Sequence, residues 1–297
     1  MSLVINHNMM AANAARTLGN HYGQLGTSVQ RLSSGLRVNS AADDAAGLAI
    51  REIMRSDIAA LNQGVRNAND AISLIQTADG ALGVIDEKLI RMKELAEQAA
   101  TGTYTSDQRL IIDSEYQAMA SEITRIANAT DFNGIYLLNG NLSSTSHDGT
   151  GLVSTGRLKV HFGTANDSAE DYYYVQISSA TASSLGVGNQ AAAGVNGFSI
   201  STQDSAQKAL VALRTAIVSK DIIRANLGAL QNRLQNTITN LEIQSENLQS
   251  AESRISDVDV SLEMTEFVRQ QILTQSAVAM LSQANSLPRM AMQLIGG

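Results

Sequence analysis

The sequence predicts a mainly α protein, a long antiparallel helical rod whose terminal helices form a coiled coil and whose outer part carries a small β-hairpin. Three observations favour this fold class. Apolar residues recur at helical spacing near both ends of the chain. Pro288 is the single proline among 297 residues, so helices can run almost without a break. Aromatic residues make up only 4% of a chain that is 44% hydrophobic, and alanine and leucine suit thin helical bundles better than thick cores.

The N-terminal segment has the spacing of a helix that packs along one seam. Residues 3–36 are predicted to form a helix that ends near Gly35. Its larger apolar residues recur three and four positions apart: Leu18, Tyr22, Leu25, Val29, Leu32 and Leu36.

The next segment is predicted to be one long helix. Ser40, followed three residues later by Asp43, resembles a capping box, so the helix is expected to start there and to run to about Thr101. Gly80 costs a helix about 1 kcal/mol relative to alanine. The apolar stripe nevertheless resumes on both sides of it, which favours a continuous helix.

A third helix and a small β region are predicted to follow. The helix is expected to start at Thr105, with Gln108 completing a capping box. Residues 135–138 are predicted to form a short strand between two Asn-Gly turns, and residues 139–155 a polar loop. Two alternating segments then predict a β-hairpin with one covered face: Leu158, Val160 and Phe162, and Tyr173, Val175 and Ile177.

Two further helices are predicted to complete the chain. One opens at Ser201 and runs to about Ile255, and the other covers residues 258–287. The centre of the last helix is apolar on nearly every side, so other helices must enclose it. The helix before it carries a leucine at every seventh position, which is typical of helices that wind together: Leu227, Leu234, Leu241 and Leu248.

Composition excludes several classes of function. The net charge is −7 and no basic patch is present, so nucleic acid is not an expected partner. The chain has no cysteine, which excludes disulfides and thiolate metal sites. The chain has no run of about 18 or more apolar residues, the length that a membrane-spanning helix needs, so no membrane insertion is expected. The N-terminus lacks a basic region followed by an apolar core, so no cleaved signal peptide is expected.

Candidate catalytic and metal-ligating groups are sparse. Asp43 and Asp44 are consecutive, and on a helix their side chains diverge by about 100°. They are therefore interpreted as N-terminal helix charges that the helix dipole favours. No catalytic, cofactor-binding or metal-binding residue is assigned, and the histidines are scattered: His7, His21, His147 and His161.

Several motifs resemble bacterial flagellin. The longest is Leu32–Ile50, with the sequence LSSGLRVNSAADDAAGLAI. The resemblance covers about residues 1–140 and 200–297, and the segment between them carries no match. The further motifs that carry it are Gln30–Arg31, Arg91–Gln98, Thr130–Gly134, Ala251–Asp257 and Gln283–Pro288.

The resemblance implies a domain plan. Residues 1–42 with 256–297 would form an inner coiled-coil polymerisation domain. Residues 43–140 with 200–255 would form a helical rod, and residues 141–199 a short variable surface region of loops and a β-hairpin. This plan describes a short form of the family with a minimal outer part.

The resemblance also implies what the protein does and what it meets. It would be the structural subunit of the flagellar filament, exported through the flagellar type III secretion channel without a cleaved signal peptide and located outside the cell. Copies would polymerise into a helical propeller for swimming. Its partners would be other copies of itself, a flagellar export chaperone, the hook-filament junction and filament cap proteins, and the host's flagellin-sensing Toll-like receptor.

Three sets of site residues are expected from this resemblance. The polymerisation interface would include Leu18, Tyr22, Leu25, Val29, Leu32, Ile272 and Leu281. The receptor and the neighbour along the protofilament would contact Arg91, Leu95 and Glu115. Taken alone, Arg91 and Glu115 are equally typical of a solvated helix face, and only the family motif favours recognition. O-glycosylation would fall on a cluster that is otherwise typical of loops: Ser143, Ser144, Thr145, Ser146, Thr150, Ser154 and Thr155.

Alternatives to a filament subunit remain open from the sequence. A junction or cap-like accessory of the same organelle would share the terminal helices but exist in few copies. A soluble helical chaperone or adhesin would keep its ends folded as a monomer. An enzyme on a helical scaffold would need a clustered site, which the sequence does not indicate.

Overall fold

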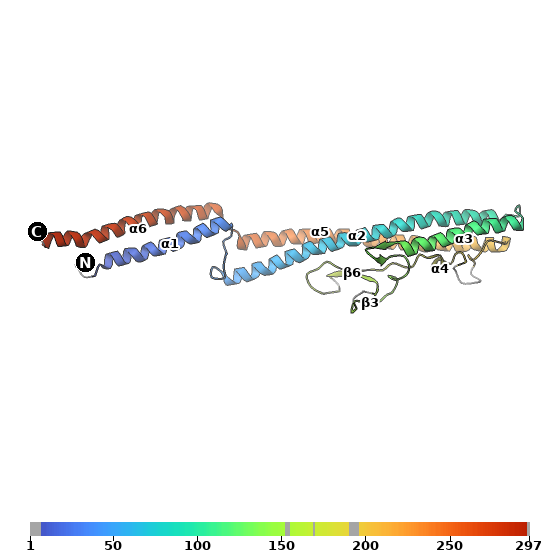
Figure 1. The fold of residues 1–297 in the computed structure, drawn as a ribbon, viewed down its shortest axis with the longest axis horizontal. Coiled ribbons are helices and arrows are strands. Elements are labelled where there is room, and N and C mark those ends of the chain that lie inside the picture. The colour runs from blue at the N-terminus through green and yellow to red at the C-terminus, as the bar shows by residue number, and fades with distance from the viewer. Residues whose placement is uncertain (1–6, 152–154, 169, 190–195, 296–297) are drawn as a thin grey trace. The chain divides into compact units, whose positions relative to one another are not determined.

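The computed structural model describes residues 7–151, 155–168, 170–189 and 196–295, and its described part is mainly α. The chain forms two compact units. Met1–Ile58 and Glu246–Gly297 make the first, and Ala59–Ser245 the second. The predicted inner domain falls within the first unit (Figure 1).

The first unit contains a hairpin of two helices, which we call the α1–α6 hairpin. Helix α1 (Met9–Ser34) packs along α6 (Val260–Ile295), and the two run antiparallel (Figure 1). Gly35 ends α1 in a left-handed conformation, as predicted. The prediction that the last helix stops before Pro288 is wrong, because α6 continues through it. Pro288 lacks an N–H for the carbonyl of Ala284, but Asn8 Nδ2 donates to that carbonyl at 2.8 Å.

The predicted start of the second helix is also wrong by several residues. Helix α2 (Ala45–Ala100) begins after a turn in which the Asp43 carboxylate accepts from Ser40, through its backbone N–H and its hydroxyl. These bonds lower the pKa of Asp43. The cap is Asp44, whose side chain accepts from Gly47 N at 2.9 Å. Ser40 and Asp43 are hydrogen-bonded to each other, but their bonds close a turn before the helix and do not cap it. From there α2 runs without a break through Gly80, as predicted.

The second unit packs α3 (Ser106–Ala129) and most of α2 and α5 (Gln203–Ser256) around an apolar core. The predicted capping box of Thr105 and Gln108 is present at the start of α3. Thr202, one residue after the predicted Ser201, caps α5 by accepting from Ser205 N. Fully buried side chains come from all three helices: Leu82, Ile85, Leu89, Met92, Tyr116, Ile123, Leu213 and Leu234.

Three two-stranded antiparallel sheets are described in the segment between α3 and α5. Strands β1 (Asp131–Phe132) and β2 (Ile135–Tyr136) flank an Asn-Gly turn, and β3 (His147–Asp148) pairs with β4 (Thr155–Gly156) inside the region predicted as a loop. The predicted hairpin is confirmed as β5 (Leu158–His161) and β6 (Tyr172–Val175). A short helix, α4 (Ala182–Leu185), follows.

The β5–β6 hairpin lies directly against α2. Asn67 Nδ2 donates to His161 O at 2.8 Å, and a Cβ on Gly64 would lie 2.0 Å from Phe162 O. The absence of a side chain at position 64 therefore permits the close approach. Among the helices that the structure describes, none is long and apolar enough to span a membrane.

Candidate assembly surface and receptor-contact face

The inner side of the α1–α6 hairpin is unusually polar. Ser28 and Gln270 are 3% and 4% exposed, and Thr274 is buried beside them. His21 Nδ1 lies 2.9 Å from Gln270 Oε1, which can only accept, so the histidine nitrogen donates. Gln270 in turn donates to Glu266 at 2.7 Å, and this bond lowers the pKa of that carboxylate. A hydrogen-bonded chain thus crosses from α1 into α6.

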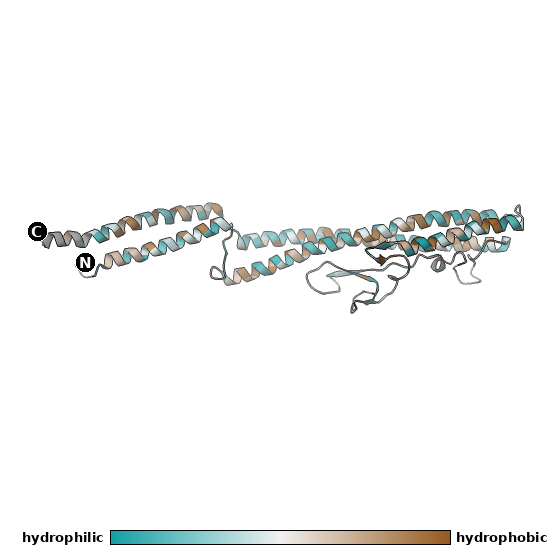
Figure 2. Ribbon diagram, in the orientation of Figure 1, coloured by the Kyte–Doolittle hydropathy of each residue, from teal (hydrophilic) through white to brown (hydrophobic). Residues whose placement is uncertain are grey.

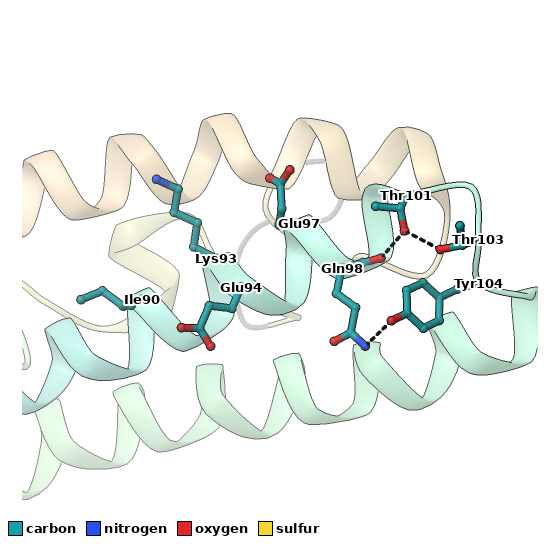
Figure 3. A pocket seen from close by; sticks show the side chains of 8 residues that line it. All are labelled: Ile90, Lys93, Glu94, Glu97, Gln98, Thr101, Thr103 and Tyr104. Atoms are coloured by element: carbon teal, nitrogen blue, oxygen red, sulfur yellow. Dashed lines mark hydrogen bonds between the residues drawn. The ribbon is translucent and has the colours of Figure 1, made fainter.

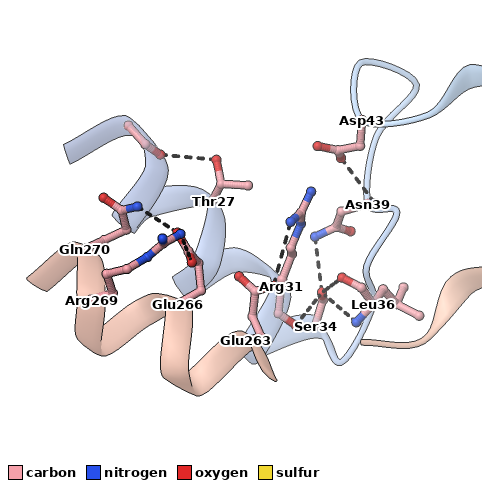
Figure 4. Close-up of polar contacts among 11 residues, drawn as sticks. Thr27, Arg31, Ser34, Leu36, Asn39, Asp43, Glu263, Glu266, Arg269 and Gln270 are labelled. Atoms are coloured by element: carbon pink, nitrogen blue, oxygen red, sulfur yellow. Dashed lines mark hydrogen bonds and ion pairs between the residues drawn. The ribbon is translucent and has the colours of Figure 1, made fainter. Parts of the chain in front are cut away.

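A second polar contact lies near the C-terminal end of α1 and the N-terminal end of α6. Arg31 Nη1 lies 3.7 Å from the Glu263 carboxylate (Figure 4). Within the described residues, Arg31 Nε and Glu263 Oε1 are buried without a hydrogen-bond partner. The pair is therefore loose, and its members remain partly unsatisfied.

The outer side of the same hairpin carries many exposed apolar side chains among polar ones. Hydrophobic residues recur among hydrophilic ones along both helices (Figure 2). Large apolar side chains of both helices are 38–71% exposed. On α1 they are Met9, Met10, Tyr22 and Val29, and on α6 they are Val260, Leu262, Met264, Val268, Ile272, Leu273, Val278, Met280 and Met290. Exposed apolar area of this extent is typical of a surface that another molecule covers.

The expected polymerisation residues divide between the two sides. Leu18, Leu25, Leu32 and Leu281 are half-buried. The three α1 leucines alternate at spacings of three and four with His21 and Ser28, which places them on the inner side. By contrast Tyr22, Val29 and Ile272 are 55%, 48% and 56% exposed. The predicted stripe combined two heptad positions, that of Leu18, Leu25 and Leu32 and that of Tyr22 and Val29. The sequence signal that distinguishes the inner side is a third set of residues at intervals of seven: Ala14, His21 and Ser28.

A second candidate surface lies on α2 and α3. Arg91 donates to Glu115 through Nη2 at 2.8 Å and Nε at 3.0 Å, and through Nη1 to Glu94 at 3.0 Å. Glu115, and then Glu94, raise the pKa of Arg91. All three side chains are exposed, so the group presents one cation between two carboxylates.

An open groove of about 620 Å³ adjoins this group. One face of α2 and the loop after it supply the lining, in which Gln98 donates to the Tyr104 hydroxyl at 3.0 Å (Figure 3). The lining residues are Ile90, Lys93, Glu94, Glu97, Gln98, Thr101, Thr103 and Tyr104.

Leu95 does not belong to the exposed face. It is 1% exposed and lies in the core of the second unit. Its side chain therefore cannot touch a partner in this conformation, and the expectation of a direct contact must be corrected for it. Arg91 and Glu115 remain available at the surface.

The hydroxyls expected to carry glycans are largely on the surface. Ser143, Ser144, Thr145, Ser146 and Thr150 are exposed. Ser143 donates to Gly140 O, Ser144 contacts Ser146, and Thr150 donates to Asp148, so several hydroxyls already have local partners. Thr155 lies in β4, and Ser154 lies outside the described residues.

No cluster of three or more His, Asp or Glu suited to a metal ion occurs among the described residues. The two units define a class of helical structural protein: the second unit has a filled apolar core, while the terminal hairpin buries polar side chains such as Gln270 and exposes many of its larger apolar ones.

Comparison with known proteins makes this class specific. Residues 5–143 match the family model of the bacterial flagellin N-terminal helical region, and residues 210–295 match that of the C-terminal helical region. The chain is 41% identical to flagellin FlaB1 of Treponema pallidum (strain Nichols), over 96% of each chain. It is also 41% identical to a flagellin of Halalkalibacterium halodurans, over 99% of this chain and 100% of that one. A flagellar hook-associated protein structure from Vibrio parahaemolyticus shares the fold, at 14% identity and a TM-score of 0.55 over 72% of this chain and 100% of that one.

The chain therefore belongs to the bacterial flagellin family, as a short form. This family is structural and not enzymatic, and it places the chain in the flagellar filament outside the cell.

Proposed function

We propose that copies of this flagellin polymerise through the outer faces of α1 and α6, and that the domain plan of inner domain, rod and variable surface region describes the subunit in its filament. The observation that carries the proposal is the distribution of side chains in the α1–α6 hairpin, in which Ser28 and Gln270 are buried. Three large apolar side chains are exposed instead: Tyr22, Val29 and Ile272. Full burial of one such apolar side chain contributes about 1.5–3 kcal/mol. Burial of a dozen such side chains would favour association, because the summed free energy exceeds the entropy cost of association.

Removal of α1 tests this proposal. The purified full chain should form long tubes when salt or short filament seeds are added, as seen by negative-stain electron microscopy. A chain that lacks residues 1–30 should form none, because α6 loses its partner and one outer face disappears. A chain with Tyr136→Asp, an exposed apolar residue of the second unit, is the control and should still form tubes. Tubes from the truncated chain would contradict the proposal.

We further propose that the host's flagellin-sensing Toll-like receptor, and the neighbour along the protofilament, contact the Arg91–Glu115 face. The ion pair is exposed and adjoins a groove with a mixed polar and apolar lining. Leu95 acts from beneath it, by holding that part of α2 in the core.

Reporter cells that express the receptor test the contact. Arg91→Ala with Glu115→Ala should lower the response, while Arg125→Ala with Glu122→Ala should not. The control pair is a similar exposed ion pair on α3, with a 2.7 Å contact. An equal response to both variants would contradict the proposal.

Export and modification complete the proposed function. The chain would leave the cell unfolded through the flagellar type III channel, with an export chaperone, and would then meet the junction and cap proteins. Exposed hydroxyls at Ser143–Ser146 and Thr150 would accept O-linked glycans. Intact mass spectrometry of filaments from the native host checks the glycans, and an unmodified mass would contradict them. Copies trapped in the cytoplasm of a strain without the export channel would support the route.

A further inference from the structure

The methionines of this chain differ in exposure between the α1–α6 hairpin and the rest of the molecule. Met92 on α2 is fully buried, and Met54 on α2 and Met119 on α3 are half-buried. In the hairpin, every methionine whose side chain the structure describes is 44–66% exposed. We call this set the five hairpin methionines: Met9, Met10, Met264, Met280 and Met290. Exposed thioethers are thus gathered on the surface that the proposed assembly covers.

Methionine is the side chain of this sequence that a peroxide oxidises most readily. The chain has no cysteine and no tryptophan, so neither a thiol nor an indole competes for the oxidant. The thioether sulfur attacks one peroxide oxygen, the O–O bond breaks, an S–O bond forms, and water leaves. The sulfur loses two electrons and the peroxide gains them, which leaves a methionine sulfoxide. Because the peroxide must reach the sulfur, the five hairpin methionines should react before Met92 in the free subunit.

A sulfoxide changes what the hairpin surface can bury. A thioether is apolar and flexible, and it adapts to an irregular partner surface. The sulfoxide oxygen is a polar acceptor, and burial against apolar side chains such as Val268, one turn from Met264, leaves it without a donor. Oxidation of the hairpin should therefore weaken its contacts with other copies, while the core around Met92 stays intact.

We propose that the five hairpin methionines are an oxidation site that controls assembly: a peroxide converts the free subunit into a form that other copies exclude. This inference rests on the proposed polymerisation through α1 and α6. Copies within a filament cover these side chains, so the modification acts on subunits before they assemble. It is reversible, because methionine sulfoxide reductases return the sulfoxide to the thioether while two thiols of a reductant become a disulfide and the oxygen leaves as water.

Partly oxidised wild-type chain tests the site without any substitution. The purified full chain is treated with hydrogen peroxide until a minority of its methionines are oxidised, freed of the oxidant, and polymerised with filament seeds near its critical concentration. Peptide mass spectrometry then compares the pellet with the supernatant. Sulfoxide at the five hairpin methionines should be enriched about tenfold in the supernatant, as burial of one unsatisfied acceptor implies. Sulfoxide at Met119 should divide equally, and equal division at the hairpin positions would overturn the inference.

A variant with leucine at the five positions provides a matched comparison. Leucine is similar in size to methionine and has no sulfur, so this variant should polymerise with the same critical concentration before and after peroxide treatment. It combines Met9→Leu, Met10→Leu, Met264→Leu, Met280→Leu and Met290→Leu. The control, Met54→Leu with Met119→Leu, should stay sensitive, and its critical concentration should rise at least about tenfold after oxidation. An equal rise in the two variants would contradict the inference. If the five-leucine variant does not polymerise, the division of wild-type sulfoxide between pellet and supernatant decides.

Reversal and protection distinguish a defined modification from general damage. Methionine sulfoxide reductases of both stereochemical classes, with dithiothreitol, should return the critical concentration of the oxidised wild-type chain to its untreated value. Loss of assembly that persists after the sulfoxides have been reduced would overturn the inference. Preformed filaments should oxidise at the five hairpin methionines several-fold more slowly than the free chain, and equal rates would contradict it. Failure of the proposed function would appear separately, as tubes from the untreated chain that lacks residues 1–30.

Discussion

The two units of this flagellin use opposite solutions to the same problem of pairing long helices. In the second unit, Leu82 and Leu89 are fully buried between helices, and charged side chains mark the edges of the seam. In the α1–α6 hairpin, Ser28 and Gln270 are buried, and Ile272 is exposed. The second unit therefore has a filled apolar core of its own, while the α1–α6 hairpin has none, and in the proposed assembly further copies cover its exposed apolar side chains.

The largest expected difference concerns apolar truncations. Leu82→Ala should lower the free energy of unfolding by about 3–5 kcal/mol, because it leaves a cavity in a filled core. Ile272→Ala should change it by less than about 0.5 kcal/mol, because that side chain is largely solvated in the monomer. Urea unfolding followed by circular dichroism measures both, and equal losses would contradict the difference between the two units.

Lys220 tests how the second unit tolerates a buried charge. Its side chain is 2% exposed, and Nζ lies 2.6 Å from both Asp86 on α2 and Asp221 on α5. Asp86→Ala leaves one carboxylate for a buried ammonium and should cost about 2–3 kcal/mol. Lys220→Met with Asp86→Leu should recover most of that loss. A double-mutant cycle by thermal melting checks this, and a double variant weaker than Asp86→Ala would be contrary to it.

Two glycines of α2 should respond with opposite sign. Gly80 has no atom within 4 Å of the position of a Cβ, so Gly80→Ala should stabilise the chain by up to about 1 kcal/mol. Gly64→Ala would press a methyl group into Phe162 O and should cost about 1–3 kcal/mol. Melting temperatures give the signs, and stabilisation by both variants would show that the β5–β6 hairpin does not rest on α2.

The smallest expected effect is a pH dependence. Arg224 lowers the pKa of Asp79 below 3.8, with Nε–Oδ1 at 2.7 Å. A carboxyl whose pKa is lower in the folded state stabilises the fold above the unfolded value and loses that contribution as the pH falls through the folded value. Wild type should therefore exceed Asp79→Asn in melting temperature at pH 6 by a small margin, because the pair is partly exposed. The margin should shrink as the pH falls below 3.8, and a constant margin would contradict the assignment.

Much of this fold could be predicted from periodicity and capping signals. The long helix through Gly80, the Thr105 cap and the β5–β6 hairpin follow from local patterns that tertiary contacts do not override. The start of α2 could not be predicted in this way, because the Asp43 carboxylate accepts hydrogen bonds within a turn, and the next residue, Asp44, caps the helix. The continuation of α6 through Pro288 is accompanied by a hydrogen bond from Asn8 to the Ala284 carbonyl, and a contact between residues so far apart in sequence cannot be recognised locally.

The candidate surfaces were harder to predict than the helices. Apolar spacing predicted that α1 has a seam, but Leu25 faces inward and Tyr22 outward, and only the second helix decides which. Leu95 was expected at the surface because it shares a motif with Arg91, yet four positions along α2 it points into the core. Burial depends on neighbours that a single sequence does not place.

The most direct test of the outer face is the critical concentration for polymerisation. Ile272→Asp places a charge on the outer face of α6, while Tyr136→Asp makes the same change at an exposed apolar residue of the second unit. Sedimentation of filaments should show a critical concentration that rises at least about tenfold for Ile272→Asp, since a buried charge costs more than about 1.4 kcal/mol. The control should stay near wild type. Equal critical concentrations for Ile272→Asp and wild type would contradict assembly through this face.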